Sequence, residues 1–362
     1  MSEYKKDIWN IVLTAGFLFV FSLASILKPA EEVSLQERRK LAQFPEVSMK
    51  SVLDGRFSKG FEAYVMDQFP GRNAFLQLNT VLDRYVLGRK DIDGITVHDG
   101  AAYAMEYPMH IDSIEHAAHI FTKIQDTYLN EDNHVYVSVI PDKSKFLGDD
   151  ALKMDHAAFA QKVKDALPAM QYIDIMSTLT VEDYYKTDPH WRQEKIVDTA
   201  DVLIRSMGGS TSTAYEVEKA ADNFLGSYGG KVPGLKKEDM YYLTNDRIEK
   251  LTVYDAQNDR EIDVYDMKKA NGRDPYEMYL SGPLSLIKIH DPTVKNGRKL
   301  VLFRDSFGSA IAPLLTGTYE DITLVDIRYL PSALLGNKVD FTNADVLFLY
   351  STSVLNHSET LK

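Results

Sequence analysis

The sequence predicts an α/β fold with a mostly parallel sheet flanked by helices, following an apolar segment at the amino terminus. Short apolar runs at 134–140, 300–303 and 346–350 are typical of buried strands, and the first of them is rich in β-branched residues. Stretches with apolar residues on one helical face, such as 111–129, stand between them. Strands that alternate with helices favour parallel pairing, because each connection must cross over the sheet.

The apolar segment at the amino terminus, residues 11–27, carries no charge and is closed by Lys28. As a helix it would be about 25 Å long, the short end of the length that spans a bilayer. The small residues Ala24 and Ser25 run into further apolar residues, so no clean cleavage site follows. We expect residues 1–28 to be an uncleaved, single-pass anchor in the cell membrane, with the remaining chain outside the cytoplasm. A cleaved signal peptide and a buried core helix are the alternatives.

The chain after the anchor divides by composition. Residues 29–50 are polar and bounded by proline, which predicts a stalk. Helical spacing of apolar residues follows over 51–85, with a Pro-Gly turn within 68–73. We expect one folded domain over 51–362. Within it the stretch 239–290 is rich in Tyr, Asp and turn residues, which indicates a β-rich insertion.

Composition excludes several functions. The net charge of −12 argues against a nucleic-acid-binding surface, which needs a basic patch. The chain has no cysteine, so thiol nucleophiles, disulfides and thiolate metal sites are ruled out. His116 and His119 are three residues apart on a predicted helix, but no carboxylate spacing completes a metal site. The glycine-rich stretch 226–234 lacks the spacing of a phosphate-binding loop. We expect no metal and no cofactor.

The segment Thr187-Asp188-Pro189-His190-Trp191 is the first candidate for catalysis. The proline favours an extended backbone at Asp188, and residues two apart in an extended segment point to the same side. The Asp188 carboxylate would then lie beside the His190 imidazole and hold it in one tautomer. Trp191 could wall the site or stack on a sugar ring. The alternative is a surface turn with an incidental histidine and a buried tryptophan.

Ser306 is the second candidate, because it follows the apolar strand 299–303 at a polar turn. A serine at such a strand-to-helix turn lies at the carboxyl edge of the sheet, where α/β folds bind ligands. Amide groups at the start of the helix could stabilise an oxyanion. The alternative is that Ser306 or Asp305 caps the helix. Arg328 and Tyr329 follow the next strand and are candidate oxyanion or sugar contacts; otherwise they are a surface ion-pair partner and a half-buried ring.

These motifs resemble a known family. TDPHW at 187–191 together with RDSFG at 304–308 is similar to the DHHW proteins and the alginate O-acetylation proteins, which share an SGNH-hydrolase-like fold. ERRKLAQFP at 37–45, DQFPGR at 67–72 and IPDKSKF at 140–146 also resemble segments of such proteins. Arg72 and Lys143 lie in two of these segments, and we expect each to brace a loop.

The resemblance implies a serine-dependent enzyme with a Ser306 nucleophile, a His190 general base and Asp188 as its orienting partner. Family members act outside the cytoplasmic membrane on polysaccharides, so the implied reaction is acetyl transfer to hydroxyls of an exopolysaccharide or cell-wall glycan. A membrane-bound O-acyltransferase is the implied acetyl donor. Arg304 stands where the family often has glycine, which bears on the oxyanion hole and makes Arg304 a candidate contact there.

Two other functions fit the same residues. If water is the acceptor, the triad makes the protein a carbohydrate acetylesterase. If the triad is vestigial, the protein is a non-catalytic glycan-binding subunit of an acetylation complex. The sequence does not separate acetyl transfer from ester hydrolysis, because the half-reaction that acylates the serine is common to both.

Overall fold

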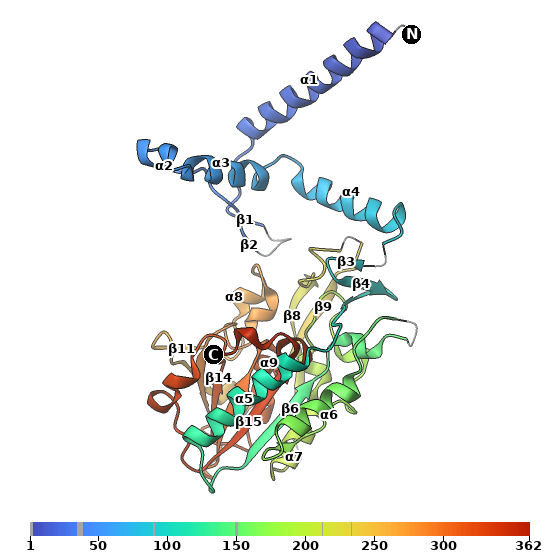
Figure 1. Cartoon of the computed structure of the whole chain (residues 1–362). Coiled ribbons are helices and arrows are strands. Elements are labelled where there is room, and N and C mark those ends of the chain that lie inside the picture. Colours follow the sequence, from blue (N-terminus) through green and yellow to red (C-terminus); the bar gives the residue numbers. More distant parts are fainter. Residues whose placement is uncertain (1–2, 35–38, 90, 149–150, 212, 233) are drawn as a thin grey trace. The chain divides into compact units, whose positions relative to one another are not determined.

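The chain forms two compact units in the computed structural model (Figure 1). The structure describes residues 3–34, 39–89, 91–148, 151–211, 213–232 and 234–362. The first unit is the chain up to Ile92 with the loop 230–233, and the second comprises 93–229 and 234–362.

The first unit is mainly helical in its described part. Its elements are α1 (Glu3–Leu27), β1 (Val33–Ser34), β2 (Arg39–Lys40), α2 (Met49–Leu53), α3 (Arg56–Asp67), α4 (Arg72–Tyr85) and β3 (Asp91–Ile92). In α1 the stretch Lys5–Leu27 is long and apolar enough to cross a membrane. The predicted Pro-Gly turn separates α3 from α4, where Gly71 has a left-handed φ of 73° that glycine adopts without strain.

Two family-like segments of the sequence meet in this unit. The Arg39 guanidinium donates hydrogen bonds of 2.8 and 2.6 Å to the Asp67 carboxylate, which lowers the pKa of Asp67 to about 2. Asp67 also accepts the Ala42 N–H at 2.7 Å. The Gln68 amide bonds to both backbone groups of Glu31, at 2.9 and 2.8 Å. These contacts tie the turn after α3 to the segment that follows α1.

The first unit includes residue 50 and continues to Ile92. Hydrogen bonds of Arg39 with Asp67 and of Glu31 with Gln68 hold this unit together. Local composition does not predict these bonds, because the bonded residues are far apart in the sequence. Glu37 and Arg38 of the predicted segment 37–45 lie outside the described residues.

The second unit is built on an eight-stranded sheet with the order β11-β10-β12-β14-β13-β15-β6-β7. Its strands are β6 (Val135–Ile140), β7 (Gln171–Tyr172), β10 (Thr252–Asp255), β11 (Arg260–Ile262), β12 (Leu286–His290), β13 (Lys299–Arg304), β14 (Asp321–Val325) and β15 (Ala344–Ser351). The five strands from β14 to β7 pair in parallel, whereas β10, β11 and β12 pair antiparallel. The predicted α/β class with a mostly parallel sheet is confirmed.

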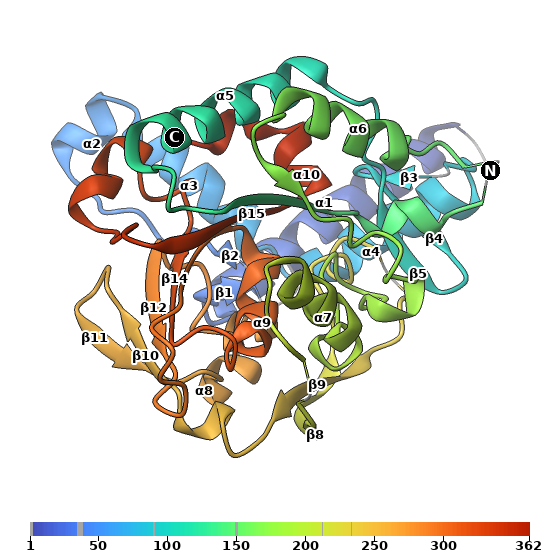
Figure 2. The same ribbon diagram turned by 90° about the horizontal axis from the view of Figure 1, so that it is seen from below.

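Helices cover both faces of this sheet (Figure 2). They are α5 (Ile111–Tyr128), α6 (His156–Ala166), α7 (Val197–Ser206), α8 (Met267–Ala270), α9 (Ser306–Leu315) and α10 (Thr352–Asn356). Val301 and Phe303 of β13 join the core under α5 and α6, and Leu300 and Leu302 join the core under α7 and α9. Because both faces are buried, the central strands are apolar throughout, as is usual for parallel sheets.

The stretch 239–290 contributes to two sheets. β9 (Glu238–Thr244) pairs with β8 (Glu216–Phe224) outside the main sheet. β10, β11 and β12 instead extend the main sheet, with Ile287 and Ile289 of β12 in its core. The predicted β-rich character is present, but part of the stretch belongs to the scaffold itself. A separate hairpin, formed by β4 (Ile95–His98) and β5 (Ala101–Ala104), turns at Asp99-Gly100.

The carboxyl ends of the parallel strands meet at one edge. β13 aligns Arg304 with Leu349 of β15, and β15 aligns Ser351 with Ile140 of β6. The turn after β13 and the segments after β6, β14 and β15 therefore all leave the sheet on the same side. This edge carries the candidate site.

Candidate active site

Ser306 is the first residue of α9, directly after the turn that follows β13. The Asp305 carboxylate accepts the Phe307 N–H at 3.0 Å and the Ser351 N–H at 2.8 Å, so it caps α9 and joins the ends of β13 and β15. Because Asp305 fills the capping position, the hydroxyl of Ser306 is available for another contact. Amides in the first turn of a helix have no partner within the helix, so this end of α9 attracts negative charge.

His190 lies on a tight loop that closes on itself. Tyr184 and Trp191 form an antiparallel bridge, and the Tyr185 N–H donates to the His190 carbonyl at 3.0 Å. Residues 186–190 bend between these points, so they do not form the extended segment that the sequence predicted. The bend still brings the carboxylate of Asp188 to the imidazole of His190, because the Asp188 carboxylate also accepts the His190 N–H at 3.2 Å.

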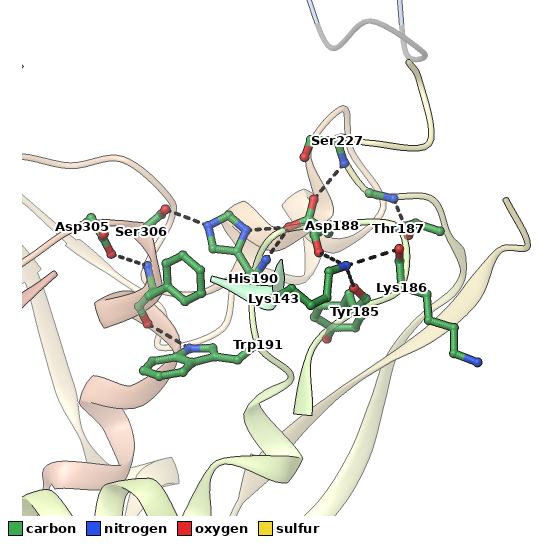
Figure 3. Close-up of polar contacts among 12 residues, drawn as sticks. Lys143, Tyr185, Lys186, Thr187, Asp188, His190, Trp191, Ser227, Asp305 and Ser306 are labelled. Carbon is green, nitrogen blue, oxygen red and sulfur yellow. Dashed lines mark hydrogen bonds and ion pairs between the residues drawn. The ribbon is translucent and has the colours of Figure 1, made fainter. Parts of the chain in front are cut away.

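The structure brings Ser306, His190 and Asp188 together (Figure 3). The imidazole Nδ1 lies 2.6 Å from Asp188 Oδ1, and Nε2 lies 2.7 Å from Ser306 Oγ. A carboxylate only accepts hydrogen bonds, so Nδ1 carries the proton and Nε2 accepts from the serine hydroxyl. Asp188 is 1% exposed, whereas His190 and Ser306 are partly exposed. This arrangement can move a proton from the hydroxyl to the imidazole.

A backbone loop holds the carboxylate of Asp188 from the other side. The Ser227 N–H donates to Asp188 Oδ2 at 2.8 Å, and the Gly226 N–H donates to Thr187 Oγ1 at 2.8 Å (Figure 3). The glycine-rich pattern of 226–234 predicts only a loop and no contact with Asp188. The pair of small residues, Gly226 and Ser227, is a local signal compatible with a close backbone approach.

Lys143 supports the histidine loop from below. Its side chain is buried, and its ammonium group donates to the carbonyls of Tyr185, Lys186 and Asp188 at 2.5, 3.4 and 3.0 Å (Figure 3). Burial lowers the pKa of Lys143 to about 8, although nearby carboxylates, Asp188 first among them, favour the charged form. Three carbonyl acceptors match the three donors of an ammonium group. Lys143 thus braces a loop, as expected from the sequence.

The ring of His190 is held between aromatic side chains. Tyr276, from a short 3-10 helix at Pro275–Met278, stacks on it with ring centroids 3.9 Å apart and planes 11° apart. Phe307 contacts it at 4.7 Å. Tyr276 is buried, and burial raises its pKa well above the ordinary value, so the phenol is neutral. Tyr276, which lies in the Tyr-rich stretch 239–290, therefore packs behind the histidine.

Trp191 does not line the site. It is 0% exposed, its indole N–H donates to the Phe307 carbonyl at 3.2 Å, and its ring packs edge-on to that of Phe307. The expectation that Trp191 walls the site or stacks on a sugar is therefore wrong. It anchors the histidine loop to the first turn of α9 instead.

Arg304 is also buried. It is 1% exposed, donates to the Leu284 carbonyl at 3.1 Å and lies 3.6 Å from the Asp326 carboxylate. A guanidinium held by these interior partners is a structural ion pair, which argues against the predicted oxyanion or substrate contact. A Cβ atom at Gly308 would come within 2.5 Å of Arg304 Cβ, so glycine in RDSFG lets the helix start against the strand.

Arg328 and Tyr329 lie at the same sheet edge, after β14. The Arg328 guanidinium donates to Asp326 at 2.9 and 2.6 Å, which makes Asp326 a shared partner of Arg304 and Arg328. Tyr329 is 54% exposed, with the Arg328 guanidinium 5.5 Å from the centre of its ring. Of the predicted substrate contacts, Tyr329 is the one with a ring open to solvent. No cluster of metal-binding side chains occurs among the described residues.

Comparison with known proteins supports the fold. The sequence model of the DHHW protein family matches residues 37–112. A DHHW family protein from Eubacterium siraeum DSM 15702 is 18% identical, with a TM-score of 0.59 over 74% of this chain and 93% of that chain. PatB1 of Bacillus cereus, in a structure with a sulfonyl adduct, is 18% identical, with a TM-score of 0.60 over 72% of this chain and 95% of that chain. No curated protein sequence matches. The predicted resemblance to DHHW proteins is confirmed, and the chain shares the fold of these two solved structures.

Proposed function

We propose that this protein is a serine-dependent O-acyltransferase that passes an acetyl group through Ser306 to hydroxyls of an extracytoplasmic polysaccharide. One observation carries the proposal: Ser306 Oγ lies 2.7 Å from His190 Nε2, while Nδ1 of the same ring is bound to Asp188. A nucleophile, a base and a residue that orients the base are the parts that acyl transfer through serine needs.

The first half-reaction loads the enzyme. Ser306 Oγ attacks the carbonyl carbon of the acetyl donor while His190 Nε2 takes the hydroxyl proton, and Asp188 stabilises the resulting imidazolium. The negative charge on the carbonyl oxygen develops next to the first turn of α9, where the helix dipole favours an anion. The donor's leaving group departs with the proton from His190, which leaves an acetyl ester on Ser306.

The second half-reaction transfers the acetyl group from Ser306 to a sugar hydroxyl. His190 takes a proton from a sugar hydroxyl, the sugar oxygen attacks the acetyl carbon, and Ser306 leaves as the group that regains the proton. Tyr329, with an exposed ring at the same sheet edge, is the proposed sugar contact. The proposed donor is a membrane-bound O-acyltransferase, which would suit a chain whose α1 has the length and composition of a membrane span. Its support is the family resemblance and the apolar helix.

The nucleophile is tested with an aryl sulfonyl fluoride on the full-length protein. In this reaction the serine oxygen replaces fluoride on sulfur, so intact mass rises by one sulfonyl group and peptide mapping locates it. We expect labelling at Ser306 and loss of labelling in Ser306→Ala. Ser309→Ala, one turn further along α9, should label like the wild type. Labelling that persists in Ser306→Ala would refute the assignment.

The acceptor is tested with a chromogenic acetyl ester as donor and a panel of oligosaccharides. Acetylated sugar that depends on Ser306 supports transfer. If acetate is released and no oligosaccharide becomes acetylated, the protein is a carbohydrate acetylesterase instead. The proposal fails if Ser306 is not labelled and the protein does not turn over the ester, while oligosaccharides still bind. The protein is then a glycan-binding subunit.

A further inference from the structure

The first unit carries an apolar face that its own described residues leave uncovered. On α4 the side chains of Phe75, Leu78, Val81 and Leu82 are each between 41% and 53% exposed. Their spacing of three and four residues places them on one side of the helix. The opposite side carries the polar residues Asn73 and Thr80 together with one leucine, Leu76. A helix of this kind in water needs a partner for its apolar side.

α3 and the segment before it add to this apolar surface. Phe44 contacts the rings of Phe57, Phe61 and Tyr64, with centroids 6.3, 5.9 and 5.4 Å apart. Phe44 nevertheless remains 56% exposed and Phe61 42% exposed. These aromatic side chains are therefore clustered without being buried.

The position of α4 along the length of α1 indicates what covers the apolar side of α4. Phe21 of α1 stacks on Phe69 with centroids 5.1 Å apart and contacts Phe75 at 5.8 Å. Phe21 lies six residues before Leu27, where α1 ends, which is about 9 Å along the helix axis. Amphipathic helices at a membrane surface bury their apolar side about 5–10 Å into the boundary between head groups and acyl chains. The start of α4 is thus held at the depth of that boundary.

Polar contacts fix this arrangement at the end of α1. Gln68, at the end of α3, bonds to both backbone groups of Glu31, four residues after Leu27. Arg39 and Asp67 hold the same turn through two hydrogen bonds. In Figure 1, α2, α3 and α4 run across the end of α1, as helices in the plane of a membrane would beside a spanning helix.

We infer that α3 and α4 lie in the outer interface of the membrane, with their apolar sides among the lipid acyl chains. The inference rests on the proposal that α1 spans the bilayer. Lipid is favoured over a second protein because the contacts of Phe69 and Phe75 with Phe21 already place these helices at bilayer depth. Both signs of charge occur in α3 and α4, so burial of apolar surface, and not attraction to anionic lipid, is the driving force.

The experiment uses spin labels on the full-length protein in phosphatidylcholine nanodiscs. The chain has no cysteine, so a single introduced cysteine gives one label. Leu78→Cys reports the apolar side of α4, and Thr80→Cys is its matched control on the polar side of the same turn. Leu18→Cys reports the middle of α1. Collision with oxygen marks lipid, and collision with a water-soluble nickel complex marks water.

We expect the Leu78 label to collide with oxygen and to be shielded from nickel, and the Thr80 label to show the reverse. A Leu78 label open to nickel would overturn the inference. A Leu78 label shielded from both reagents would also overturn it, because a protein partner would then cover this side. Leu82→Cys repeats the test if Leu78→Cys folds poorly.

The label at Leu18 and the labelling of Ser306 test the membrane anchor and the active site separately from this inference. If Leu18 lies in lipid and Leu78 in water, the interfacial placement fails and the anchor stands. If Leu18 is in water or the segment has been removed, the anchor fails and the inference fails with it. Labelling of Ser306 by the sulfonyl fluoride tests the active site independently of both.

Discussion

A methyl group on the α-carbon of Gly226 would lie 2.3 Å from the Cβ atom of Asp188 and equally close to the Thr187 carbonyl oxygen. Two backbones meet here with no room for a side chain. The closeness allows the amides of Gly226 and Ser227 to bind Thr187 and Asp188. The orientation of Asp188, the hydrogen-bond partner of His190, therefore depends on a glycine about forty positions away in the chain.

Gly226→Ala should lower kcat strongly without preventing folding. The methyl group must push the loop away from Asp188, and a displacement of about 1 Å in a catalytic group costs roughly 100-fold in rate. Hydrolysis of the chromogenic ester measures kcat, and circular dichroism checks the fold. Gly272→Ala, on an exposed turn where the nearest atom is 3.2 Å away, is the control and should stay near wild type. Full activity in Gly226→Ala would show that this contact does not position Asp188.

Asp188→Asn should lower kcat by about 10⁴-fold. An amide can donate to Nδ1 of His190, which favours the tautomer with the proton on Nε2, and that nitrogen then no longer accepts from Ser306. Stability should change less than activity, since the amide is nearly the same size. Asp183→Asn, at the base of the same loop, controls for a general effect on the loop. A loss below about tenfold would contradict the role of Asp188 in orienting the base.

Tyr276 should act on catalysis through its ring and not through its hydroxyl. The ring face lies against the imidazole at 3.9 Å, so it can stabilise the imidazolium by about 0.5–2 kcal/mol. Tyr276→Phe keeps the ring, and we expect near-normal kcat. Tyr276→Leu removes it, and we expect a loss of about 2- to 30-fold, following from that energy. Equal losses in both variants would assign the effect to the hydroxyl.

Part of this site could be predicted because its signals are local. An apolar strand that ends in a polar turn and a helix places Ser306 at the carboxyl edge of the sheet. The spacing of Asp188 and His190 brings two side chains of one short loop together. The burial of Trp191 was not predicted, because it depends on contacts with Phe307 of α9, a distant segment of the chain.

The remaining parts depend on contacts between distant segments. Ser227 and Tyr276 reach the histidine loop from segments with no catalytic signature. Arg304 stands where the family often has glycine, but its partner Asp326 directly follows β14, the strand beside β13, and the sequence alone does not show this pairing. Pairing of this kind is set by the order of strands in the sheet, which periodicity alone does not determine.

Lys143 should make stability depend on pH in the alkaline range. Its pKa is about 8 in the folded protein, below the ordinary 10.5 of an unfolded chain, because the ammonium group is buried. Between these values the unfolded chain holds a proton that the folded protein has released, so the free energy of unfolding rises with pH there. Below about pH 8 both states are protonated, and the cost of burying the charge is present in full.

The test compares wild type with Lys143→Met by urea unfolding from pH 7 to pH 10.5. At 1.36 kcal/mol for each pKa unit, the stability of wild type relative to Lys143→Met should rise by about 3 kcal/mol across this range. Taking the difference cancels groups common to both proteins, including the buried tyrosines. Lys145→Met is the control: Lys145 is only partly buried and donates to the Met176 carbonyl, so its difference curve should be flatter. A flat curve for Lys143→Met would mean that the folded protein keeps this lysine charged, and its three carbonyl contacts would then be those of an ammonium group throughout the range.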